Sequence, residues 1–136
     1  SFGGCSMLPE LTPEQRAKLA RGWVWQEGHL PVGSKSRVSG YLAPRELTPD
    51  LNDPVTADGL LRTARAMWRD EGLHVVPTDT GFALCVVRPR VNGERWRYVW
   101  DGESWARPPA GRSLKVQFQS EQAALLAAIL AAPEAT

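Results

Sequence analysis

The 136-residue chain has little of the chemistry that marks a catalytic or metal-binding site, because it contains only two cysteines and two histidines. Cys5 lies in a loose N-terminal stretch and Cys85 in an apolar run, so the pair does not predict a disulfide framework. His29 and His74 have no second ligand at a spacing usual for metal sites. The sequence therefore predicts a reduced, cytoplasmic protein without a metal ion or a cofactor.

An excess of charge and a long apolar run are also lacking. Sixteen basic residues stand against fifteen acidic ones, which gives a net charge of +1. So small a net charge creates no global field that would attract nucleic acid or a membrane. The longest apolar run, residues 123–132, is about half of the ~20 residues that a membrane-spanning helix requires. We therefore expect no membrane association, and nucleic acid only through a local patch.

The common catalytic motifs do not occur either. The segment GHLPVGSKS (28–36) has glycines at a spacing similar to that of a phosphate-binding loop, but Ser34 separates its second glycine from Lys35. The neighbouring carboxylates Asp101 and Glu103 flank a predicted turn, where solvated acids are common. The sequence predicts that the chain is not an enzyme.

Composition favours an ordinary globular domain. Hydrophobic residues make up 43% of the chain and charged residues 23%, and the length suits a single domain. Residues 1–6 precede Met7 and are expected to be a cloning remnant. Residues 7–136 are expected to form one α+β domain.

Three segments have helical signals. They span residues 11–22, 53–72 and 121–132. Thr12 is the expected N-cap of the first helix, and Gln15 completes a capping box with it. Ser120 is the expected N-cap of the last helix.

Several segments alternate as strands do. They are residues 23–27, 73–77, 81–91, 94–100 and 113–118, with 37–43 as a further short edge strand. The dipeptide Asn92-Gly93 between two of them is a strong hairpin signal. Short turns require antiparallel pairing. The sequence predicts an α+β fold, with a mostly antiparallel sheet of about five strands and helices packed on its faces, like an α-β-α sandwich.

The order of these elements resembles the phage ABA sandwich domain family. The similar parts are LARGWVW, LTPDLNDPVTADGLL and SEQAALLAAILAA. The resemblance implies an antiparallel sheet with helices on both faces, in a protein of phage or prophage origin. It implies no activity, so it assigns no catalytic residues.

The predicted hairpin carries four arginines. If Asn92-Gly93 is a two-residue loop, Arg90 lies opposite Arg95, and Arg88 lies opposite Arg97. Because strand side chains alternate, all four guanidinium groups then share one face. Like charges directly opposite each other are unfavourable, so the sequence raises the question of what compensates them.

Guanidinium groups suit carboxylates and phosphates. The main hypothesis is therefore a non-catalytic, phage-type binding module that contacts the acidic surface of a partner protein through Arg88, Arg90, Arg95 and Arg97. The alternative is a nucleic-acid-binding accessory protein that uses the same arginines on phosphates. A third interpretation is a solvated hairpin tip whose charges keep a strand edge from aggregating.

Aromatic residues gather in the same region. Trp96, Tyr98, Trp100 and Trp105 are expected on one face of the sheet, where they meet Trp68 from the second helix. An alternating aromatic cluster is typical of a core. An exposed platform on which bases stack is the alternative.

The last predicted helix has no polar residue between positions 123 and 132. Two explanations are open. Exposed alanines are tolerated because alanine is the best helix former. Alternatively, Ala124, Ala128 and Ala131 lie at the interface of a twofold homodimer.

Overall fold

A computed structural model describes residues 11–39, 47–107 and 116–133. The helices are α1 Pro13–Gly22, α2 Pro54–Ala57, α3 Leu60–Trp68 and α4 Glu121–Ala131. The strands are β1 His74–Pro77, β2 Phe82–Pro89, β3 Arg95–Trp100 and β4 Trp105–Ala106. The expected remnant at residues 1–6, including Cys5, lies outside the described residues.

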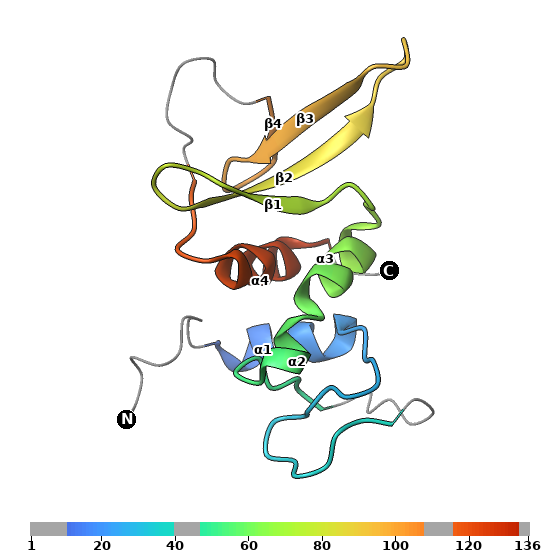
Figure 1. Cartoon of the computed structure of the whole chain (residues 1–136), viewed down its shortest axis with the longest axis vertical. Helices are drawn as coiled ribbons and strands as arrows, with labels where there is room; N and C mark the ends of the chain where they lie inside the picture. Colours follow the sequence, from blue (N-terminus) through green and yellow to red (C-terminus); the bar gives the residue numbers. More distant parts are fainter. Residues whose placement is uncertain (1–10, 40–46, 108–115, 134–136) are drawn as a thin grey trace.

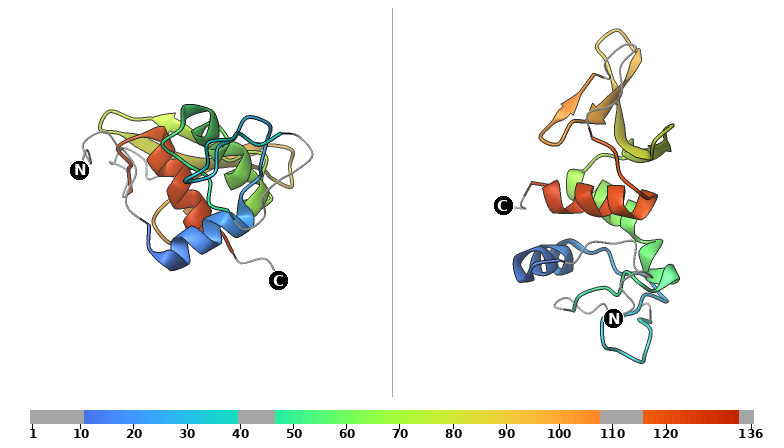
Figure 2. Two further views of the ribbon diagram at one scale, coloured as in Figure 1. Left: turned by 90° about the horizontal axis from the view of Figure 1, so that it is seen from below. Right: turned by 90° about the vertical axis from the view of Figure 1, so that its left-hand side faces the viewer.

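The elements form three layers (Figures 1 and 2). The sheet is the first layer, α3 and α4 are the second, and α1 and α2 with their loops are the third. The α+β class is confirmed. The expected placement of helices on both faces of the sheet is not found in the described part of the chain, where the helices lie on one side. The layers run sheet, helix, helix.

The sheet is an antiparallel meander in the order β1-β2-β3-β4, so it has four strands in the described residues rather than about five. Residues 23–27 form no strand. Of the expected strand 113–118, only Phe118 pairs, through a bridge to Phe82, and 113–115 lie outside the described residues. Residues 37–39 are not a strand, and 40–43 also lie outside.

Helix α1 begins as its sequence predicts. Thr12 Oγ1 accepts a hydrogen bond from the Gln15 backbone N–H at 3.1 Å, and Gln15 Oε1 accepts one from the Thr12 N–H at 3.0 Å. This capping box is therefore confirmed. Lys18 Nζ donates to the Leu130 carbonyl at 2.9 Å, which places a cation at the C-terminal end of α4 and joins the two helices.

The expected helix 53–72 is divided at Gly59 into α2 and α3. A Cβ at Gly59 would come within 2.6 Å of the His29 ring, so only glycine allows this close approach. Asp53 caps α2 by accepting from the Thr56 N–H at 3.1 Å. Helix α3 is followed by Arg69 in a left-handed conformation (φ 54°), so it ends before Gly72. None of the described helices combines the length and the apolar character that crossing a membrane requires.

Helix α4 tolerates an apolar surface all round because neighbours in the same chain surround it. It packs on β1 and β2, on α3 and on α1. Ala124, Ala128 and Ile129 are fully buried, and the Ala128 carbonyl accepts a hydrogen bond from Trp68 Nε1 at 2.7 Å. Neither explanation offered by the sequence was therefore right for these alanines.

The expected dimer interface is placed differently by the structure. Ala124 and Ala128 lie inside the single chain and cannot contact a second copy, whereas Ala131 is exposed. A homodimer would need another surface, and self-association itself stays a prediction.

The expected aromatic core is confirmed for three tryptophans. The ring centroids of Trp68, Trp100 and Trp105 lie 5.1 to 5.7 Å apart, with edge-to-face geometry in each pair. Such pairs are favourable beyond the area that they bury. This cluster fixes the sheet on the α3–α4 layer.

Two substitutions in α4 test its burial. Ala128→Leu should lower the free energy of unfolding by about 1–3 kcal/mol, because added methylene groups meet a filled core. Ala131→Leu, on the exposed side, should change it by less than about 0.5 kcal/mol. Chemical denaturation of both variants measures the difference. Equal effects would contradict the placement of α4 between the sheet and α1.

Candidate functional site

The loop between β2 and β3 contains three residues, Val91, Asn92 and Gly93. Arg90 and Glu94 close it, since the Arg90 N–H donates to the Glu94 carbonyl at 2.6 Å. The Gly93 N–H donates back to the Arg90 carbonyl at 2.9 Å. The expected two-residue loop is therefore wrong.

The turn type explains the extra residue. A two-residue type I′ loop needs positive φ at both central positions. Gly93 has φ 85°, but Asn92 does not have positive φ, and its side chain instead accepts from the Glu94 N–H at 3.1 Å. A type I turn followed by a left-handed glycine fits this geometry.

The longer loop shifts the register of the hairpin by one residue. Arg88 pairs with Trp96, and Pro89 pairs with Arg95. Because side chains alternate along a strand, arginines at even and odd positions point to opposite faces. The expected quartet is therefore divided into an inner pair, Arg88 and Arg90, and an outer pair, Arg95 and Arg97.

The inner pair lies on the face of the sheet that the helices cover, and it has partners within the chain. Arg88 Nε lies 3.2 Å from Asp70 Oδ2, at the end of the helix layer. The Arg90 guanidinium carbon lies 3.8 Å from the centre of the Trp96 ring, and its Nη1 donates to the Tyr98 hydroxyl at 3.3 Å. The inner pair thus contributes to holding the hairpin in place.

Trp96 contacts two cations. The Arg107 guanidinium carbon lies 3.9 Å from the ring centre, as close as that of Arg90. Two guanidinium groups cannot occupy the same space over one ring, so they cover opposite faces. Trp96 Nε1 also donates to Glu94 Oε2 at 3.1 Å. This indole has no free face, so it does not support the alternative of a platform for stacked bases.

The outer pair is different. The side chains of Arg95 and Arg97 are exposed and form no hydrogen bond, ion pair or ring contact with any described residue. Their cross-strand neighbours, Pro89 and Val87, carry no charge. The outer pair is therefore the part of the predicted patch that is open to a partner.

Cys85 lies on the same face as the outer pair. It is 1% exposed, as expected for a structural thiol, but it pairs with Val99 and not with the expected Trp100. Burial raises the pKa of the Cys85 thiol, and the positive charge of Arg97 partly opposes that shift. A buried thiol of raised pKa is not a reactive nucleophile.

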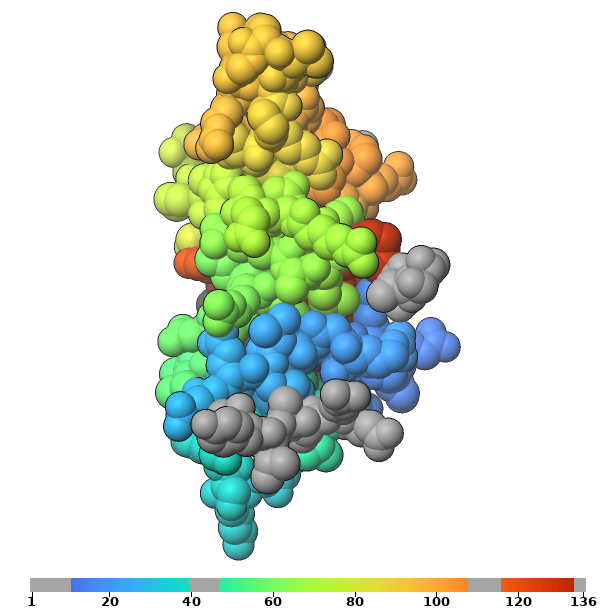
Figure 3. All heavy atoms as spheres, turned by 90° about the vertical axis from the view of Figure 1, so that its right-hand side faces the viewer, coloured from blue at the N-terminus to red at the C-terminus, as the bar shows by residue number. Residues whose placement is uncertain are grey.

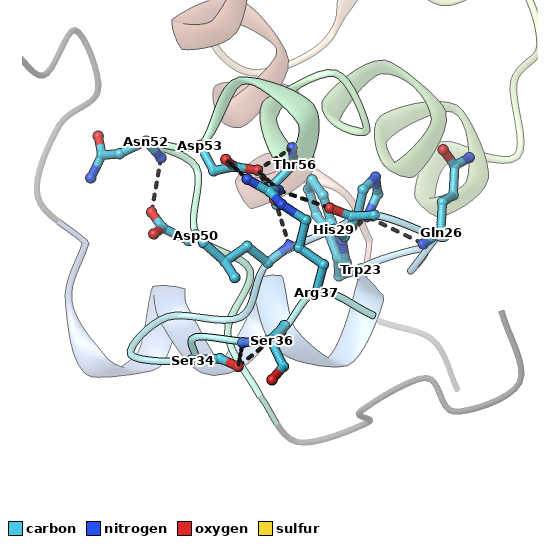
Figure 4. A network of polar contacts seen from close by, with 12 residues as sticks. Trp23, Gln26, His29, Ser34, Ser36, Arg37, Asp50, Asn52, Asp53 and Thr56 are labelled. Carbon is cyan, nitrogen blue, oxygen red and sulfur yellow. Dashed lines mark hydrogen bonds and ion pairs between the residues drawn. The ribbon is translucent and has the colours of Figure 1, made fainter. Parts of the chain in front are cut away.

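A second polar cluster orders the N-terminal loops (Figure 4). Arg37 binds both carboxylate oxygens of Asp53, at 2.8 and 2.9 Å, and donates to the Gly28 carbonyl at 3.0 Å. Thr56 Oγ1 donates to Asp53 at 2.8 Å and accepts from the Leu30 N–H at 2.7 Å. The Arg37 hydrogen bonds hold the pKa of Asp53 well below its usual range. These hydrogen bonds hold the loop in place.

His29 is also structural. It is 2% exposed, and its Nδ1 accepts from Trp23 Nε1 at 3.1 Å and from the Gln26 N–H at 3.2 Å. The ring must therefore carry its proton on Nε2. In the described ranges, no group of three His, Cys, Asp or Glu side chains could hold a metal ion. No local pattern predicts this burial, because it depends on close approach to Gly59, thirty positions away.

Comparison of the chain with protein-family models, with curated proteins and with solved structures finds no match. The resemblance to the phage ABA sandwich family therefore stays a prediction from the order of the sequence elements.

The two arginine pairs should differ in their effect on stability. Replacing Arg88 and Arg90 with glutamine should lower the free energy of unfolding by about 1 kcal/mol, through loss of a half-exposed ion pair and a cation–π contact. The same change at Arg95 and Arg97 should leave it within about 0.5 kcal/mol. Thermal unfolding of the two double variants measures this. An equal loss in both would mean that the outer pair also has a structural partner.

His29 should make stability depend on pH. Burial lowers its pKa below the ordinary 6.5, so near that pH the unfolded chain binds more protons than the folded one. Stability is then fully present above about pH 6.5 and falls as the pH decreases below it. His29→Gln should have a lower free energy of unfolding overall, but this free energy should no longer decrease below about pH 6.5. His74→Gln keeps His29 and serves as the control. Parallel pH profiles of all three proteins would contradict the assignment.

Proposed function

We propose that the chain is a non-catalytic binding module of phage or prophage type that contacts an acidic partner protein through its hairpin. The observation that carries the proposal is the outer pair. Arg95 and Arg97 lie side by side on a hairpin that projects from one end of the molecule (Figure 3), and they have no partner among the described residues. The phage or prophage origin is supported by the sequence resemblance alone.

The inner pair supports the same role indirectly. Arg88 ties β2 to Asp70, and the stack of Arg90, Trp96 and Arg107 ties the hairpin to the residue after β4. A hairpin held in one position loses little conformational freedom when it binds, which favours affinity. The inner pair thus holds the hairpin in position, and the outer pair is left to contact the partner.

The chemistry at the tip favours a protein over nucleic acid. Val91 is fully exposed (108%), and Pro89 beside Arg95 is exposed as well. Arginine next to exposed apolar side chains is typical of protein interfaces. Two guanidinium groups on phosphates would give a salt slope of only about −1.8, which means weak non-specific DNA binding.

Nucleic-acid binding is the second candidate, and one observation favours it. Arginines emerge from both faces of the β2–β3 ribbon. A ribbon in a major groove has phosphates on both sides, so it could use both pairs. This mode would require Arg88 to leave Asp70 and Arg90 to leave Trp96.

Binding to two labelled probes tests the proposal. Poly-glutamate represents an acidic protein surface, and a short DNA duplex represents nucleic acid. Fluorescence anisotropy should show that the chain binds poly-glutamate and that Arg95→Gln with Arg97→Gln weakens binding at least tenfold, about 1.4 kcal/mol. Arg88→Gln with Arg90→Gln is the matched control, with the same change of charge, and should bind nearly as the unchanged protein does.

The outcomes are distinct. Equal losses in both double variants would mean that net charge alone drives binding. Preferential binding of the duplex, with a salt slope near −3.6 for four phosphate contacts, would establish the alternative. No binding of either probe at low salt would leave the hairpin as a solvated tip.

A further inference from the structure

The helical layers contain a groove with an acidic rim and a small apolar floor. It encloses about 350 Å³ between α2, α3 and the start of α4. Ala57, Leu61 and Leu125 provide its apolar surface. Exposed Asp58 and Glu121 provide carboxylates, and none of the described residues that line it is an arginine or a lysine.

The hairpin tip has the complementary chemistry. Val91, the most exposed large apolar side chain in the described residues, lies in the loop that precedes β3, the strand that carries the outer pair. The groove volume exceeds that of a valine side chain, and its rim carries carboxylates, the groups that the guanidinium groups of Arg95 and Arg97 bind most strongly. A second groove of similar size among the described residues, between α1 and α4, carries Lys18 and Arg21 beside Glu14, so its charge does not match.

The tip and the groove of one chain cannot meet. The hairpin tip projects from the sheet end of the molecule, away from the helical layers below the sheet that contain α2 and α4 (Figure 1). A net charge of +1 also means that copies of the chain hardly repel one another.

We infer that the acidic partner of the hairpin is a second copy of this chain, whose groove between α2, α3 and α4 receives Val91 and the outer pair. This inference rests on the proposed function and names the partner. The contact joins two different surfaces, so it is head-to-tail, and it generates a ring if it closes and a filament if it does not.

Analytical ultracentrifugation at low salt tests the inference. The average mass should rise with protein concentration above that of one chain. Arg95→Glu with Arg97→Glu should abolish association, and so should Asp58→Lys with Glu121→Lys. A mixture of these two charge-reversed proteins should associate again, because each supplies the surface that the other one lacks.

Further variants guard against loss of folding. Asp58→Asn with Glu121→Gln removes the charges more gently and should weaken association at least tenfold. Val91→Ser should also weaken it, and because this side chain is fully exposed in the single chain, the change should leave the fold intact. Glu71→Lys with Glu103→Lys makes the same charge change on exposed carboxylates outside the groove and should have no effect.

Two results would overturn the inference. One is a single-chain mass at every concentration, and the other is association that survives both charge reversals. The poly-glutamate probe separates this failure from that of the proposed function. A monomer that still binds the probe through Arg95 and Arg97 retains the proposed function and needs a different acidic protein.

Discussion

Burial of α4 is the constraint on which the other elements depend. This helix has no polar residue between positions 123 and 132, so it is stable only where it is covered on several sides. The sheet, α3 and α1 supply that cover. Ala124 and Ala128 leave room for close approach because their side chains are small. The apolar α4 therefore lies between the sheet and α1. With this order of layers, every described helix lies on one side of the sheet.

The same arrangement explains why the hairpin projects. The α3–α4 layer covers the part of β2 and β3 that carries Leu84, Val86 and Trp100, which are buried. Toward the turn the two strands extend beyond this layer: β2 is exposed from Arg88 onward, and in β3 only Trp96 and Tyr98 stay partly buried before Val99. Asp70, just after α3, is the last helical-layer group that reaches them. The boundary between core and projecting arm thus falls where apolar residues give way to arginines in the sequence.

Local signals predicted the elements well and their long-range relations poorly. The capping box at Thr12, the Ser120 cap and the strand alternation around the hairpin depend on neighbours in sequence, and all are found. The division of the second helix depends on His29 packing against Gly59, thirty positions away, so no local pattern contains it. The hairpin arginines were misplaced for a different reason. Asn92-Gly93 is compatible with a two-residue and a three-residue loop, and the extra residue moves one pair of arginines to the opposite face of the sheet from the other pair.

The register also answers the question of what compensates the arginines. In the expected two-residue loop, two like-charged pairs would face each other, each unfavourable by a few tenths to about 1 kcal/mol. In the structure, Arg88 lies opposite Trp96, Arg97 opposite Val87, and Arg95 opposite Pro89. The strand pairing itself therefore removes the cross-strand repulsion. What remains is the repulsion within the outer pair, two residues apart on one strand face, and no carboxylate among the described residues forms an ion pair with it. An acidic partner, as proposed above, would relieve this repulsion.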